Sequence, residues 1–147
     1  MTEMEMINIL LVEDNPGDVR LTQEAFKEGM LRNNLYVVMD GEAAMEFLKG
    51  KGEHASAPRP DLVLLDLNLP KMNGREVLAA IKNDPDLKRI PVVVLTTSQD
   101  EQDIIESYKQ FASSYIVKPV SMEKFISVVA SFKQYWLSVV KLPDTEH

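Results

Sequence analysis

The sequence of 147 residues contains no cysteine. Disulfide bonds, thiolate metal sites and cysteine nucleophiles are therefore excluded. Long apolar runs are also absent, since the longest are of strand length and a membrane-spanning helix needs roughly 20 apolar residues. The first residues, "MTEMEMINILLVEDN", lack the basic segment and small-residue cleavage site of a signal peptide. We therefore expect a cytoplasmic protein with no membrane partner.

Positive charge is scarce as well. The chain has 16 Lys and Arg against 23 Asp and Glu, a net charge of −7, and its longest basic cluster is "KR" at 88–89. Non-specific nucleic-acid binding depends on cationic contacts to phosphates, so this class of function is not expected. The hydrophobic content of 45% is ordinary for a globular fold. The length suits one domain, which we assign to residues 1–147.

Strand-like and helix-like segments alternate along the chain. Apolar, β-branched runs predict strands, and runs with a helical period that end at Gly or Pro predict helices. Such alternation favours an α/β fold, a doubly wound parallel sheet covered on both faces. Asp18 is a candidate N-cap of the first helix. The predicted strands are 7–12, 35–40, 61–66, 90–97 and 114–119, and the predicted helices are 19–29, 41–50, 74–84, 99–111 and 121–140.

Polar and charged residues follow four of the predicted strands. In a parallel α/β sheet, ligands bind beyond the carboxyl ends of the strands, at the point where the strand order reverses. All the strand-end residues would lie along that one edge. They are Glu13 and Asp14 after the first strand, Asp66 after the third, Thr96 and Thr97 after the fourth, and Lys118 after the fifth.

The three carboxylates would repel one another at this edge. Two carboxylates about 5 Å apart repel by roughly 3 kcal/mol at an effective dielectric constant of about 20. A raised pKa or a bound cation would relieve this, and an all-oxygen site favours a hard cation such as Mg²⁺. Asp66 could then attack phosphorus and form an aspartyl-phosphate. Lys118 and the hydroxyl of Thr96 could stabilise charge on the phosphoryl oxygens.

Each of these residues also has an ordinary structural interpretation. Asp66 could form a turn or cap a helix, and Glu13 and Asp14 could be turn residues. Thr96 could be a plain strand residue, and Lys118 a solvated edge charge. The hypothesis of a site depends on the combination of these residues. Complementary groups at all four strand ends would arise by chance only through several independent coincidences.

Four segments carry a resemblance to a known family. Together "LLVEDN", "LLDLNLPKMNG", "VVVLTT" and "YIVKP" resemble the motifs of receiver domains from bacterial two-component response regulators. The resemblance covers about residues 6–135, with a C-terminal helix extending to about 140. It implies the flavodoxin-like (βα)5 fold with strand order 2-1-3-4-5.

The resemblance also implies roles for individual residues. Asp66 would accept a phosphoryl group from a sensor histidine kinase, with Thr96 and Lys118 as contacts of that group. Asp14 would bind Mg²⁺ directly, Glu13 through water, and the backbone carbonyl of Asn68 would be a further ligand.

Two more residues gain a role from the family pattern. Tyr115 would be the aromatic switch that follows Thr96, and Pro119 is expected to follow a cis peptide bond. Water would slowly remove the phosphoryl group, at a rate tuned by Asn68 and Ser98. The protein would thus be a phosphoacceptor switch rather than an enzyme.

The last predicted helix carries two apolar stripes where a surface helix needs one. The second stripe, which includes Phe132, Tyr135 and Val139, could pack on a neighbouring loop or form a homodimer interface. The ending "FKQYWLSVVKLP" resembles single-domain regulators that are paired with phytochrome-type kinases and tend to be dimeric. The output of such a regulator would be a protein–protein contact.

Two rival functions use a similar topology. A Mg²⁺-dependent phosphatase of the haloacid-dehalogenase type also has a strand-end Asp nucleophile, but its motif needs a second Asp where this chain has Asn68. A flavin-binding module needs a phosphate cradle after the first strand, and the acidic "EDNPGD" there would repel phosphate.

Overall fold

The computed structural model describes residues 7–28, 32–97 and 114–129. The helix predicted at 99–111, Ser98 and the last predicted helix beyond residue 129 lie outside the described residues.

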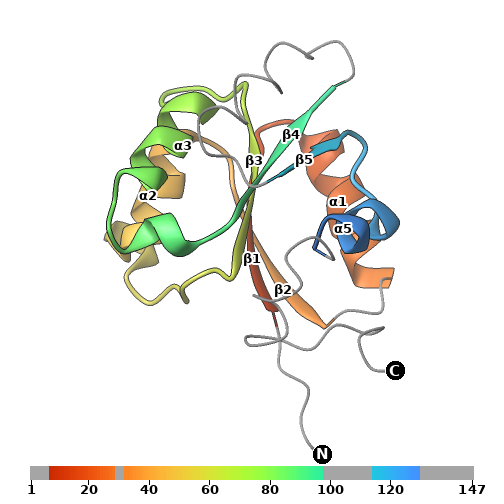
Figure 1. Cartoon of the computed structure of the whole chain (residues 1–147), viewed down its shortest axis with the longest axis horizontal. Coiled ribbons are helices and arrows are strands. Elements are labelled where there is room, and N and C mark those ends of the chain that lie inside the picture. Colours follow the sequence, from red (N-terminus) through yellow and green to blue (C-terminus); the bar gives the residue numbers. More distant parts are fainter. Residues whose placement is uncertain (1–6, 29–31, 98–113, 130–147) are drawn as a thin grey trace, which may run out of the picture.

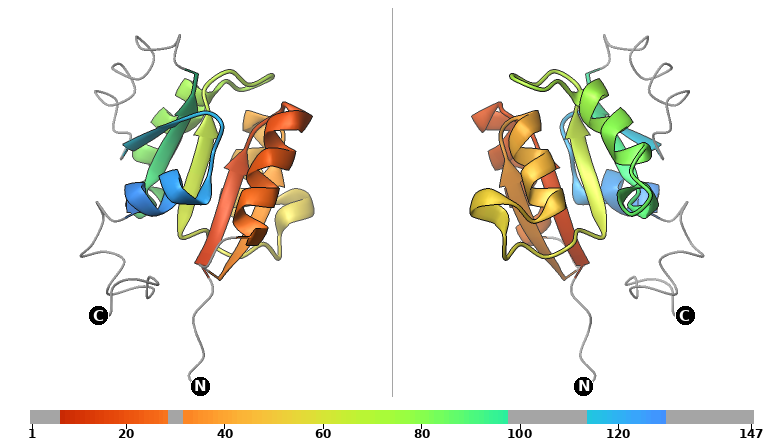
Figure 2. Two further views of the ribbon diagram at one scale, coloured as in Figure 1. Left: turned by 90° about the vertical axis from the view of Figure 1, so that its right-hand side faces the viewer. Right: turned by 90° about the vertical axis from the view of Figure 1, so that its left-hand side faces the viewer.

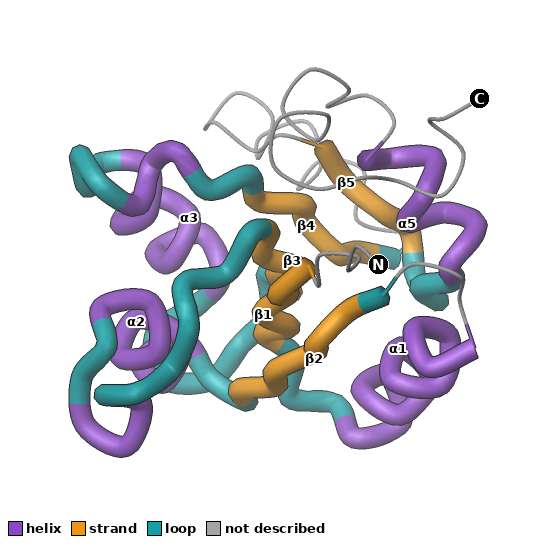
Figure 3. The backbone as a smooth tube through the Cα atoms, turned by 90° about the horizontal axis from the view of Figure 1, so that it is seen from below, coloured by secondary structure: helices purple, strands orange, loops and turns teal. Residues whose placement is uncertain are grey.

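The described strands form one five-stranded sheet. Every adjacent pair is parallel, and the order is β2-β1-β3-β4-β5, as the resemblance implied. Figure 3 shows the strands following one another in this order across the molecule. The strands are β1 (Ile7–Val12), β2 (Asn33–Val38), β3 (Leu62–Asp66), β4 (Val92–Thr96) and β5 (Ser114–Val117).

Helices cover both faces of the sheet. In Figure 1 the sheet is seen nearly edge-on, with α2 and α3 on one face and α1 and α5 on the other. The two side views in Figure 2 each bring one of these helical layers to the front. The α-helices are α1 (Pro16–Glu28), α2 (Gly41–Lys49), α3 (Gly74–Lys82) and α5 (Met122–Val129), and the short 3-10 helices are η1 (Gly52–His54) and η2 (Leu87–Arg89).

The core has one half on each face of the sheet, because successive side chains of a strand point to opposite faces. Ile9 and Leu11 of β1 join the half beneath α1 and α5, where the rings of Phe26 and Phe125 lie 4.7 Å apart. Leu10 of β1 joins the half beneath α2 and α3. All five residues of β3 are buried, which explains why its first four residues are all apolar rather than alternating with polar ones.

The start of α1 differs from the prediction. The helix begins at Pro16, and the Asn15 side chain accepts a hydrogen bond of 3.0 Å from the backbone N–H of Asp18. The proposed N-cap role of Asp18 was therefore wrong, since this residue lies within the first helical turn. Proline suits the first position of a helix because its missing N–H would have no partner there.

The ends of the other helices follow ordinary capping rules. Asp40 caps α2 by accepting a 2.7 Å hydrogen bond from the N–H of Ala43, and Gly50 ends it in the left-handed conformation. Asn73 and Glu76 form a capping box at the start of α3.

The strand predicted at 35–40 begins earlier, at Asn33, and ends at Val38.

Candidate functional site

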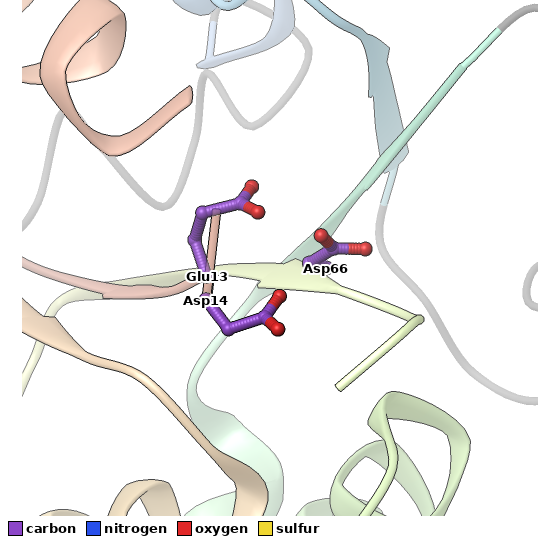
Figure 4. A group of neighbouring side chains, drawn as sticks. All are labelled: Glu13, Asp14 and Asp66. Carbon is purple, nitrogen blue, oxygen red and sulfur yellow. The ribbon is translucent and has the colours of Figure 1, made fainter. Parts of the chain in front are cut away.

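Three carboxylates converge at the carboxyl edge of the sheet. Glu13 and Asp14 directly follow β1, and Asp66 is the last residue of β3. These two strands are neighbours, and β1 lies at the point where the strand order reverses. Each residue offers a carboxylate oxygen, and the three oxygens lie within 4.8 Å of one another. Figure 4 shows the three side chains gathered at the ends of the two strands.

The ammonium group of Lys118 lies among these acids. Its Nζ atom is 2.9 Å from Oδ2 of Asp66 and 3.0 Å from Oε1 of Glu13. The backbone N–H of Lys118 donates a 2.7 Å hydrogen bond to the carbonyl of Thr96, which fixes this loop to the end of β4. The peptide bond between Lys118 and Pro119 is cis, which confirms the prediction.

Burial and crowding shift the protonation of two of these groups. Burial, together with the neighbouring Asp66 carboxylate, raises the pKa of Glu13 to about 7, although Lys118 opposes the shift. Burial alone would lower the pKa of Lys118, but its hydrogen bonds with Asp66 and Glu13 raise that pKa above the usual lysine range. Lys118 therefore remains a cation, while Glu13 carries a proton more readily than an ordinary glutamate.

The backbone around Asp66 holds its carboxylate in a defined position. Oδ1 of Asp66 accepts a 3.0 Å hydrogen bond from the N–H of Asn68, while Lys118 binds Oδ2. The loop after β3 then folds back tightly, since the N–H of Gly74 donates a 3.0 Å hydrogen bond to the carbonyl of Leu67. A Cβ atom at Gly74 would lie 2.4 Å from the carbonyl oxygen of Asp66, so a side chain does not fit here.

The two predicted switch residues lie on the neighbouring strands. Thr96 is buried at the end of β4, and its hydroxyl donates a 3.3 Å hydrogen bond to the carbonyl of Thr97. The sheet register pairs Thr96 with Val117, the residue before Lys118. Tyr115 lies in β5 and is 38% exposed. The structure thus places Thr96 beside the lysine loop and Tyr115 on the adjacent edge strand.

One residue of the cluster was missed by the sequence reasoning. Oδ2 of Asp18 lies 3.1 Å from Nζ of Lys118, so this aspartate is a third acidic partner of the lysine. Its position in the first turn of a helix that follows a site-forming strand was the available signal. The predicted N-cap role instead had the Asp18 side chain accept a hydrogen bond from the helix backbone.

The donor set fits a divalent metal ion. The three grouped side chains offer only carboxylate oxygens, which are ligands of hard cations. Burial, and after it the neighbouring Asp66 carboxylate, raises the pKa of Glu13, and a cation bound among these oxygens would favour the ionised form.

Comparison with known proteins identifies the fold and its family. Residues 9–130 match the family described as the response regulator receiver domain. The chain belongs to this family. The receiver domain is also 51% identical over 135 residues to response regulator Rcp1 of Synechocystis sp., covering 92% of each chain.

Solved structures lead to the same family. The phosphorylated cyanobacterial phytochrome response regulator RcpA is 49% identical, with a TM-score of 0.75 and coverage of 95% of this chain and 100% of RcpA. The Mn²⁺-bound form of Rcp1 is 50% identical, with a TM-score of 0.73 and coverage of 93% and 99%. The receiver domain is therefore similar to phytochrome response regulators, and these matches do not support the alternative of a haloacid-dehalogenase-type phosphatase.

Within residues 7–28, 32–97 and 114–129, none of the helices has both the length and the apolar character needed to cross a bilayer.

Proposed function

We propose that Asp66 is the phosphoacceptor of this receiver domain and takes its phosphoryl group from a phosphohistidine of a sensor kinase. The observation that carries the proposal is the Lys118 ammonium, 2.9 Å from the Asp66 carboxylate in a cluster otherwise composed of acids. This partly buried lysine offsets some of the negative charge of the carboxylates in the resting protein. The same lysine is in place to stabilise a phosphoryl group on Asp66.

The transfer step forms one bond and breaks another. A carboxylate oxygen of Asp66 attacks phosphorus, and the phosphorus–nitrogen bond of phosphohistidine breaks, with its electron pair remaining on the imidazole. The product on this chain is an acyl phosphate. Lys118 and the Thr96 hydroxyl donate hydrogen bonds to the phosphoryl oxygens, where negative charge accumulates.

Mg²⁺ is the cofactor we propose for this step. Glu13, Asp14, Asp66 and the backbone carbonyl of Asn68 would hold it, with Glu13 acting through water. When bound, the ion supplies positive charge to the phosphoryl oxygens. The oxygen-only group formed by Glu13, Asp14 and Asp66 supports this assignment.

Signalling then requires two states that phosphorylation populates differently. Thr96 would turn toward the phosphoryl group, and Tyr115 would change rotamer on the adjacent strand, altering a protein-binding surface. Attack of water on phosphorus would return Asp66 to its free carboxylate. The domain would act as a switch with slow self-dephosphorylation rather than as a turnover enzyme.

The kinase partner is proposed to be of the phytochrome type, and this receiver domain itself is proposed to be cytoplasmic. The similarity to Rcp1 and to the phytochrome regulator RcpA supports this choice. Homodimerisation through the C-terminal helix region stays a prediction, because most of that region lies outside the described residues.

The test is incubation with Mg²⁺ and a small phosphodonor, followed by intact-mass measurement. The natural protein should gain one phosphoryl group, and Asp66→Asn should gain none. Asp86→Asn is a matched control, because Asp86 is exposed and pairs with Arg59. Retention of the added mass in Asp66→Asn would contradict the acceptor assignment.

The kinase assignment has its own test. Phosphorylated phytochrome-type kinase should transfer its label to this chain faster than an unrelated histidine kinase does. Equal rates from both kinases would remove the phytochrome link while leaving the acceptor assignment intact.

A further inference from the structure

Asp18 belongs to the lysine cluster but has no part in the function proposed above. It comes from α1, whereas Lys118 follows β5, and the two residues are 100 positions apart in the chain. Their side chains nonetheless meet at 3.1 Å. Asp18 is outside the group of carboxylates that lie close enough to share a metal ion, which consists of Glu13, Asp14 and Asp66.

The backbone of Asp18 is held on both sides. Its N–H donates a 3.0 Å hydrogen bond to the Asn15 side chain, and its carbonyl accepts a 2.9 Å hydrogen bond from the hydroxyl of Thr22. Thr22 is buried, and this second contact is partly buried. The direction in which the Asp18 side chain leaves the helix is therefore fixed by the start of α1.

The positions of the three acids indicate that Asp18 holds the Lys118 ammonium beside Asp66 rather than drawing it away. A lysine ammonium has three N–H donors, and Nζ of Lys118 has three acidic partners at 2.9, 3.0 and 3.1 Å. The ammonium bound by Asp18 thus already lies against Asp66 and need not leave Asp18 to reach it. A cation shared by the metal-binding carboxylates would weaken the hold of Glu13 on the lysine but would not engage Asp18.

We propose that Asp18 is a positioning residue for phosphoryl transfer, which holds the Lys118 ammonium beside Asp66 during the reaction. This inference depends on the proposed function of Asp66. Asp18 does not touch the reacting atoms, and it acts through Lys118 alone.

The first measurement compares rates of Asp66 phosphorylation at saturating Mg²⁺ and phosphodonor. A charge-assisted hydrogen bond contributes enough that Asp18→Asn should slow the reaction by about threefold to tenfold. Glu24→Gln removes a charge of the same sign from the same helix, where Glu24 contacts Arg20 on the surface, and it should leave the rate unchanged. Thermal unfolding of both variants checks that each is folded.

The second measurement asks whether Asp18 acts through the lysine. In a Lys118→Ala background, Asp18→Asn should cause no further loss of rate. A purely structural role of Asp18 would slow both backgrounds equally. Without metal, the NMR signal of the Lys118 Cε–Hε group should move toward that of a solvated lysine in Asp18→Asn and stay in place in Glu24→Gln.

The outcomes separate this inference from the function on which it depends. If the natural protein gains no phosphoryl group, the proposed function is wrong. If the natural protein is phosphorylated but Asp18→Asn reacts equally fast or faster, only the role of Asp18 is overturned. Equal losses in the two lysine backgrounds would overturn it as well.

Discussion

The Nζ atom of Lys118 lies 2.9 Å from a carboxylate oxygen of Asp66, although the two residues are 52 positions apart. Asp66 ends β3 and Lys118 follows β5, so the pair spans the carboxyl end of the intervening strand β4. This ion pair joins the acceptor to the cation that we expect to assist it, and four predictions follow from the surroundings of the pair.

Replacement of Lys118 should affect transfer and metal binding in opposite directions. Lys118→Ala should slow phosphorylation of Asp66 about 100-fold, the size of effect seen when one stabilising donor is lost. The same variant should bind Mg²⁺ at least about twofold more tightly, because a cation no longer competes for the carboxylates. Intact-mass measurements on reactions quenched at successive times give the rate of phosphorylation, and calorimetry gives the affinity for Mg²⁺. Lys88 is exposed in the 3-10 helix η2, and Lys88→Ala should change neither the rate nor the affinity. Weaker Mg²⁺ binding by Lys118→Ala would contradict the prediction.

Glu13 should make the metal-free protein less stable as the pH rises. Its pKa is about 7 in the folded protein against 4.5 for an ordinary glutamate, so between these values the folded state binds more protons than the unfolded state. The free energy of unfolding therefore falls with increasing pH over this window, by up to ~3 kcal/mol from this residue.

Urea unfolding in the presence of EDTA tests this at pH 5 and pH 8. Other carboxylates contribute their own pH dependence, so the useful quantity is the difference between the natural protein and Glu13→Gln. As the pH rises from 5 to 8, the free energy of unfolding of the natural protein should fall relative to that of Glu13→Gln. A constant difference would show that the pKa of Glu13 is not raised.

Addition of Mg²⁺ should stabilise the folded protein. A ligand that binds only the native state at a concentration 100 times its Kd stabilises it by about 2.7 kcal/mol. Thermal melts with Mg²⁺ and with EDTA should differ accordingly. The Asp14→Asn variant should lose most of this difference, whereas Glu24→Gln, on the exposed surface of α1, should keep it. A Mg²⁺-dependent shift that survives in Asp14→Asn would place the ion elsewhere.

A side chain at Gly74 should disturb the acceptor loop. In Gly74→Ala the new Cβ would lie 2.4 Å from the Asp66 carbonyl oxygen and equally close to Cα of Leu67, both of them backbone atoms that cannot yield easily. We expect a loss of about 1–3 kcal/mol in the free energy of unfolding. At Gly17 a Cβ would meet only the Asn15 side chain, at 3.3 Å, so Gly17→Ala should have a much smaller effect. Equal stability of the two variants would argue against the tight loop.

Much of the fold could be predicted because the relevant signals are local. The apolar runs around Leu11 and Leu64 identified buried strands, and Gly50 correctly marked the end of α2. The start of α1 was missed, because Asn15, Pro16 and Asp18 are all plausible at the beginning of a helix. Only the hydrogen bond from the Asp18 N–H to Asn15 distinguishes between them.

The sequence by itself determined the parallel sheet and the residue types at its carboxyl edge, since side-chain periodicity and turn chemistry act over a few neighbouring residues. Only the tertiary structure decided that Asp18 and Glu13 share one ammonium with Asp66, and that the pKa of Glu13 rises. Ion pairs and desolvation depend on which side chains meet across the fold and how deeply they are buried. Those distances are set by the packing of α1 and β5 on the sheet rather than by any local pattern.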